Sequence, residues 1–207
     1  MDLFTGAYGI VALPDSITER KVRDLGRRPI GTSPDPQIKN NEITRHAEFS
    51  TTTAHITLYH GKLREIPRTE VEMILRTLKP LCGSPILFDK IAVYGGKFLF
   101  LDVEVTPELR LAHLAALHLA HSLDRSSAAK ATEEGLKMSD DERASLERFG
   151  QPLTYALARP HFTLAYNSGG FPNYRTLGPF DGTGRIDRFA FAEIGEYGSV
   201  KNIILEV

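Results

Sequence analysis

Two short segments that lie far apart in the chain repeat one pattern of residue types. The first is His55-Ile-Thr57-Leu and the second is His161-Phe-Thr163-Leu. In a β-strand, side chains two residues apart lie on one face, so each segment places an imidazole beside a hydroxyl. The apolar residues between and after them would face the protein interior. The repeat therefore predicts two equivalent pairs of polar side chains, each carried by a strand.

Two such pairs facing each other would suit in-line displacement at phosphorus. A neutral imidazole can take a proton from an attacking water or hydroxyl, and a protonated one can give a proton to the departing oxygen. Threonine hydroxyls can donate hydrogen bonds to the non-bridging oxygens as charge develops on them. This scheme requires no metal ion, and the sequence leaves open which of the two histidines is the base. The alternative interpretation is that His55 and His161 are strand histidines satisfied by neighbouring hydroxyls.

Length and composition fit a soluble protein with one sizeable core. The chain has 207 residues and a formal net charge of −1, so it has no overall attraction to nucleic acid or to an anionic membrane. Its single cysteine, Cys82, allows neither an intramolecular disulfide nor a cysteine-based metal cluster. We see no signal peptide and no apolar run of about 20 residues, so we expect a cytoplasmic protein without a membrane span.

The remaining patterns predict a mixture of helices and antiparallel hairpins, which is an α+β fold. A motif strand followed by a hairpin occurs twice, which suggests a weak internal duplication. The segments 27–53 and 124–153 read as loop or surface insertions, and the first could be a lid in which Lys39, Arg45 and His46 contact phosphate. We expect solvated surface charge there instead. The expected elements are strands at 8–13, 54–60 and 161–166, helices at 16–25, 67–81, 107–123 and from Ser139, and hairpins at 85–105 and 188–207.

Strict alternation would place Tyr59 on the face of His55 and Thr57, and His60 on the opposite face. The helix at 107–123 carries His113, His118 and His121. We expect these to be ordinary helix histidines rather than metal ligands.

The two motifs resemble those of the 2H phosphoesterases, a family named for two His-x-Thr/Ser-x motifs. The similarity extends to the start Val11-Ala-Leu-Pro14 and to the order of the elements. The resemblance implies one bilobal, pseudo-twofold α+β domain over residues 1–207, with two antiparallel sheets flanked by helices around a central cleft. It also implies metal-independent hydrolysis of 2′,3′-cyclic phosphates on nucleotides or RNA ends. The alternatives are a 2′-5′ phosphodiesterase, an RNA 2′-5′ ligase, or a non-catalytic nucleotide-binding module.

By position in the motifs, the resemblance assigns catalysis to His55 and His161 and phosphate binding to Thr57 and Thr163. Family members often carry a basic residue just after the motif, whereas this chain has Tyr59 at that point of the first copy. Tyr59 is therefore a candidate for hydrogen bonding to, or stacking on, the substrate. We expect a monomer with a cyclic nucleotide or RNA end as substrate, no cofactor, no metal, and no obligatory protein partner.

Overall fold

A computed structural model of the chain describes residues 2–27, 43–44, 53–124, 138–167, 171, 177–179 and 182–207. The candidate lid residues Lys39, Arg45 and His46 lie outside the described residues, as does 125–137 within the second predicted insertion. The helices are α1 (Ser16–Arg27), α2 (Arg68–Leu78), α3 (Pro107–Ala116) and α5 (Asp140–Phe149). The strands are β1 (Leu3–Pro14), β2 (Ile43–Thr44), β3 (Ile56–Pro67), β4 (Pro85–Tyr94), β5 (Phe98–Val103), β6 (His161–Asn167), β7 (Leu177–Pro179), β8 (Thr183–Ile194) and β9 (Val200–Glu206).

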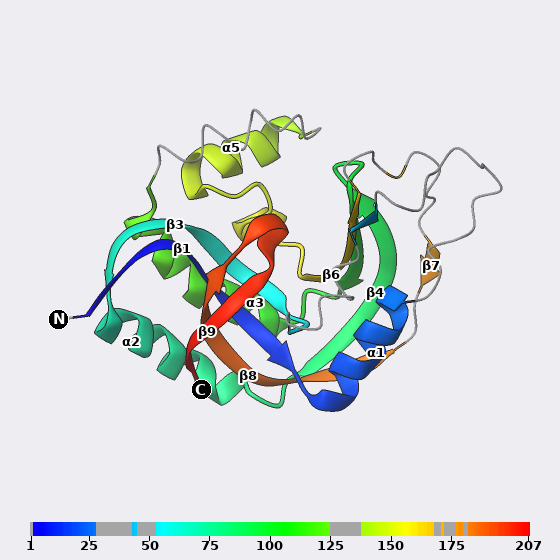
Figure 1. Cartoon of the computed structure of the whole chain (residues 1–207), viewed down its shortest axis with the longest axis horizontal. Helices are drawn as coiled ribbons and strands as arrows, with labels where there is room; N and C mark the ends of the chain where they lie inside the picture. The colour runs from blue at the N-terminus through cyan, green and yellow to red at the C-terminus, as the bar shows by residue number, and fades with distance from the viewer. Residues whose placement is uncertain are drawn as a thin grey trace.

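The described strands form one antiparallel sheet with the order β2-β6-β5-β4-β8-β1-β3, to which β7 adds beside β4 and β9 beside β8. Two halves of this sheet meet where Pro85–Leu87 of β4 pairs with Thr183–Arg185 of β8. Figure 1 shows β4 arching between the half that holds β6 and the half that holds β8, β1 and β3. β3 and β6 lie near opposite ends of the strand order and yet contact each other, which shows that the sheet curls. The predicted α+β fold is confirmed.

Residues with specific backbone roles set the element boundaries. Thr106 Oγ1 accepts from the Leu109 N–H at 3.2 Å and begins α3. Gly95 and Gly96 have φ of 57° and 76° and lie in the turn of the predicted β4–β5 hairpin. Because Tyr94 pairs with Phe98, the turn has three residues rather than the two that Gly95-Gly96 suggests. The expected helix over 107–123 is α-helical to Ala116 and continues as a 3₁₀ helix over Leu117–Ser122.

The N-terminus of α1 is capped by the side chain that precedes the helix. Ser16 and Glu19 have the spacing of a capping box, but the residue that caps the helix is Asp15. Its Oδ1 accepts from the Thr18 N–H at 2.7 Å. Glu19 instead pairs with Arg23 on the next turn, at 2.7 Å. Hydrogen bonds from Thr18 lower the pKa of Asp15, and the carboxylate also complements the positive end of the helix dipole.

The hydrophobic core extends through both halves of the sheet. It includes Ile10 and Ile56 from one half and Leu101 and Phe162 from the other. A second, smaller cluster lies on the opposite face of β1 and β8, around Val11. Since residues 9–14 of β1 are buried on both faces, the sequence there is a continuous apolar run rather than an alternating one. In the part of the chain that the structure describes, no helix is long and apolar enough to cross a membrane.

Candidate active site

A cavity of about 520 Å³ opens between the two halves of the sheet, and both sequence motifs contribute to its wall. Thr57 comes from β3, and His161 and Thr163 come from β6. The rest of the wall comes from aromatic side chains of the β4–β5 hairpin, from α3, from the segment leading into β6, and from the turn between β8 and β9. The aromatic and turn residues are Tyr94, Phe98, Phe100, Gly195, Glu196 and Gly198.

Both motif histidines make the same backbone contact. His55 Nδ1 lies 2.9 Å from the carbonyl oxygen of Thr53, and His161 Nδ1 lies 2.6 Å from that of Arg159. Each partner is two residues upstream of its histidine. A carbonyl oxygen only accepts, so Nδ1 carries the proton in both rings. In His161, Nε2 is therefore the nitrogen that is left to act on a ligand.

Both motif strands also carry a β-bulge at the same place. Leu58 is the extra residue between Thr57, which pairs with Val11, and Tyr59, which pairs with Ile10. In the second motif, Leu164 occupies the matching position after its threonine in β6. A bulge adds one residue and reverses the in-out alternation of everything that follows. The two motifs thus share the Nδ1 hydrogen bond and the bulge as well as their sequence pattern.

The bulge at Leu58 makes the predicted faces of Tyr59 and His60 wrong. Directly opposite residues share a face of the sheet, and His60 lies opposite Gly9 while Thr57 lies opposite Val11. His60 therefore shares the face of Thr57, and it lines the cavity.

Tyr59 packs into the core instead. It is 2% exposed, and its hydroxyl donates to the carbonyl oxygen of Phe149 at 2.7 Å. Burial raises the pKa of Tyr59 well above its ordinary value, so the phenol stays protonated. Because part of the residue still borders the cavity, its contact with substrate stays a prediction.

His55 has acceptors at both ring nitrogens. Besides the contact at Nδ1, its Nε2 lies 3.0 Å from the carbonyl oxygen of Gly198 in the turn between β8 and β9. Both contacts can be hydrogen bonds only when the ring is protonated. Burial lowers the pKa of His55, and the two hydrogen bonds to carbonyl oxygens oppose that effect.

His161 is a neutral imidazole at pH 7. Its ring stacks on Phe100 with centroids 3.6 Å apart. Burial is the main cause that lowers the pKa of His161 to about 4, and the charge of Arg159 and the neighbouring His55 and His60 act in the same direction. These interactions place His55 and His60 within electrostatic range of His161. His60 and His161 line the cavity, whereas His55 is not among the residues that line it. The two motif histidines therefore influence each other electrostatically, and their pairing as catalytic residues stays a prediction.

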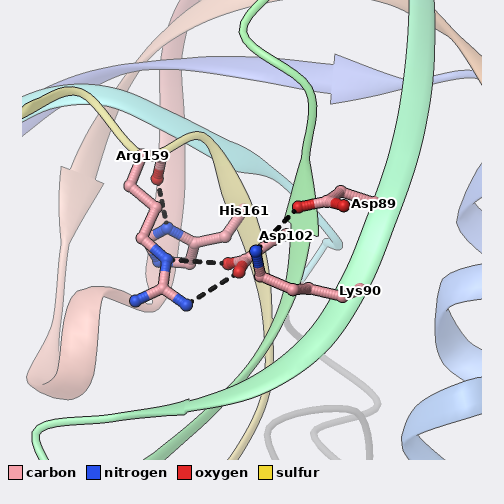
Figure 2. Close-up of polar contacts among 5 residues, drawn as sticks. All are labelled: Asp89, Lys90, Asp102, Arg159 and His161. Carbon is pink, nitrogen blue, oxygen red and sulfur yellow. Dashed lines mark hydrogen bonds and ion pairs between the residues drawn. The ribbon is translucent and has the colours of Figure 1, made fainter. Parts of the chain in front are cut away.

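A cation that the sequence analysis missed lies next to His161. Arg159 binds Asp102 through two hydrogen bonds, Nε to Oδ1 at 3.0 Å and Nη2 to Oδ2 at 2.7 Å (Figure 2). Its guanidinium lies over the rings of Tyr94 and Phe100, 5.6 and 5.7 Å from their centroids. The lack of a basic residue after the motif suggested that no cation was near. If the strand alternation is extended two residues before His161, it places Arg159 on the same face as that histidine.

The side chains of His113 and His121 have structural partners. His113 is buried; its Nδ1 donates to the Leu58 carbonyl oxygen at 2.6 Å, and its Nε2 accepts from the Tyr155 N–H at 2.8 Å. His121 contacts the carbonyl oxygen of His118 and pairs with Glu70. No group of three or more His, Cys, Asp or Glu residues within the described ranges is arranged to hold a metal ion.

Solved structures share this fold over nearly the whole chain. A structure described as a phosphoesterase has a TM-score of 0.52 at 10% identity, with 99% of this chain and 98% of that one covered. TT0787 of Thermus thermophilus has a TM-score of 0.52 at 15% identity, with coverages of 97% and 96%. E. coli LigT complexed with NADP+ has a TM-score of 0.51 at 12% identity, with coverages of 99% and 98%.

Comparison of the sequence with protein-family models and with curated proteins found no match. At 10–15% identity, what the solved structures share with this chain is the fold. The 2H phosphoesterase-like architecture that the motifs predicted is therefore confirmed at the level of the fold.

Proposed function

We propose that the protein is a metal-independent phosphodiesterase that hydrolyses 2′,3′-cyclic phosphates of nucleotides or RNA ends. The observation that supports this most strongly is the equivalence of the two motifs. Each histidine donates Nδ1–H to the carbonyl two residues upstream, and each strand bulges directly after the threonine. Two unrelated strand histidines have no reason to share both features. A nucleotide ligand is in keeping with the NADP+ bound to the LigT neighbour.

His161 is our candidate for the general base. It is neutral at pH 7, and its Nδ1 proton is held by the Arg159 carbonyl oxygen. The lone pair of Nε2 is then free to accept a proton from water as the water oxygen attacks phosphorus.

His55 is our candidate for the general acid. Its contacts with two carbonyl oxygens favour the protonated ring. In the reaction, the bond from the water oxygen to phosphorus forms while the bond from phosphorus to one ring oxygen breaks. The water proton goes to His161, and the Nε2 proton of His55 goes to the departing oxygen in place of the Gly198 carbonyl. Exchange of protons with solvent then restores both rings.

The developing negative charge would be stabilised by hydroxyls and by a fixed cation. Thr57 and Thr163 border the cavity on opposite motif strands, and each can donate to a non-bridging oxygen. Arg159 borders the same cavity, and its Nη1 makes no hydrogen bond to another residue of the described part of the chain. Asp102 holds the guanidinium in place, so this cation would not have to reorganise during the reaction.

The test is hydrolysis of 2′,3′-cyclic mononucleotides by wild type and by His55→Asn and His161→Asn. Each substitution should lower kcat/KM by about 10²- to 10⁴-fold while circular dichroism stays unchanged. Thr57→Ala and Thr163→Ala should cost less, about 2–4 kcal/mol of transition-state stabilisation at most. His118→Asn, on the exposed 3₁₀ turn, is the matched control and should retain full activity.

Full activity in either motif variant would refute the assignment, and so would loss of wild-type activity on adding a chelator. Two other outcomes identify the alternatives. Thermal stabilisation by nucleotides without turnover would indicate a binding module. A preference for 2′-5′ dinucleotides over cyclic mononucleotides would indicate a 2′-5′ phosphodiesterase.

A further inference from the structure

The position of His60 depends on a bulge that other residues hold in place. A bulged residue leaves the ladder of strand hydrogen bonds, and the Leu58 carbonyl oxygen accepts instead from His113 Nδ1 at 2.6 Å. Gly9, opposite His60 on β1, provides the space. A Cβ built on Gly9 would lie 2.7 Å from the Cβ of His60 and 2.6 Å from the Tyr59 carbonyl oxygen. Only glycine therefore fits beside this histidine.

His60 is a half-buried imidazole at the cavity that makes no hydrogen bond to any residue within the described ranges. It differs in this from His55 and His161, each of which is held by a backbone carbonyl. Burial, followed by the proximity of His55, lowers the pKa of His60 to about 4, so the ring is neutral near pH 7. A neutral imidazole offers one N–H donor and one nitrogen acceptor. A hydroxyl group, which also both donates and accepts, complements it.

The strand geometry indicates which part of a ligand His60 would meet. Thr57 and His60 are successive residues on one face of β3 once the bulge is discounted, which separates them by one pleat repeat of roughly 7 Å. A phosphate held at Thr57 would therefore have its sugar beside His60. The equivalent position in the second motif is Tyr166, whose ring packs on Phe98 with centroids 5.0 Å apart. The two motifs match around the phosphate, and they differ at this position.

We propose that His60 is a substrate-contacting residue that hydrogen-bonds a sugar hydroxyl and so makes the site selective for phosphodiesters of sugars over simple aryl phosphodiesters. This inference rests on the proposed function, because it takes the motif threonines as the phosphate site. Under this proposal, the sugar lies along β3 on one side of the pseudo-symmetric cavity. The aromatic side chains of the β4–β5 hairpin lie on the other side.

The test compares 2′,3′-cyclic AMP with bis(4-nitrophenyl) phosphate, which has no sugar. His60→Phe should raise KM for the cyclic nucleotide about three- to tenfold and change kcat less, since one neutral hydrogen bond is lost. KM for the aryl diester should stay within about twofold. His60→Asn, which keeps a donor and an acceptor, should retain most of the wild-type selectivity, and His118→Phe is the matched control. An equal effect on both substrates, or no effect on either, would overturn the proposal.

A binding measurement separates this proposal from the proposed function. Calorimetry with adenosine 2′-monophosphate and with inorganic phosphate requires no turnover. His60→Phe should weaken binding of the nucleotide and leave binding of inorganic phosphate unchanged, and His60→Leu serves if the phenylalanine variant does not fold. Unchanged nucleotide affinity in a folded variant would refute the role of His60. Absence of hydrolysis by wild type would refute the proposed function alone.

Discussion

Replacing Arg159 by methionine should destabilise the protein strongly, because the substitution leaves the buried carboxylate of Asp102 without its partner. The Asp102 side chain is 6% exposed and is paired with Arg159, which is 29% exposed. Removing one partner of a buried pair costs about 3–5 kcal/mol, and we lower this to about 2–4 kcal/mol because water reaches the arginine. For a chain of this length, such a loss corresponds to a fall in Tm of roughly 4–16 °C.

Urea denaturation and calorimetry of matched variants provide the assay. Arg68→Met makes the same substitution in the exposed pair of Arg68 with Glu72, where we expect a cost of about 0.5 kcal/mol or less. The double variant Arg159→Met/Asp102→Leu should be more stable than Arg159→Met alone, because it removes the unpaired carboxylate. If Arg159→Met costs no more than Arg68→Met, the reasoning from burial is refuted.

Further predictions concern proton transfer and the core. The pH profile of kcat/KM should rise through about pH 4, where His161 loses its proton. It should fall again at a pH below 6.5, because the pKa of His55 is lowered from that value. An optimum above pH 8 would contradict the assignment. Gly198→Ala should move the falling limb to lower pH by disturbing the carbonyl at His55. Gly83→Ala, also at positive φ in open space, should cost similar stability and leave the profile unchanged. Tyr59→Phe should lower the free energy of unfolding by about 1 kcal/mol in denaturation experiments, since the partly buried Phe149 carbonyl oxygen loses its donor; an unchanged value would show that water replaces the hydroxyl.

The sequence predicted the features of the site that depend on local periodicity. His55 and Thr57 could be placed together because strand alternation holds as far as the threonine. It fails one residue later, since a bulge depends on the neighbouring strand and on the His113 side chain, neither of which local pattern contains. Arg159 was within reach of the same alternation argument. Gly198 was not, because its contact with His55 joins residues 143 positions apart in the chain.

The strand order has a consequence for when the site can form during synthesis. β8 is close to the C-terminal end of the chain, yet it lies between β1 and β4 and joins the two halves of the sheet (Figure 1). A nascent chain that has left the ribosome only as far as residue 180 already contains both motif histidines, but it lacks the strand that joins their halves. The two halves therefore cannot be joined until β8 has been synthesised, and we expect slow long-range pairing to limit the rate of folding.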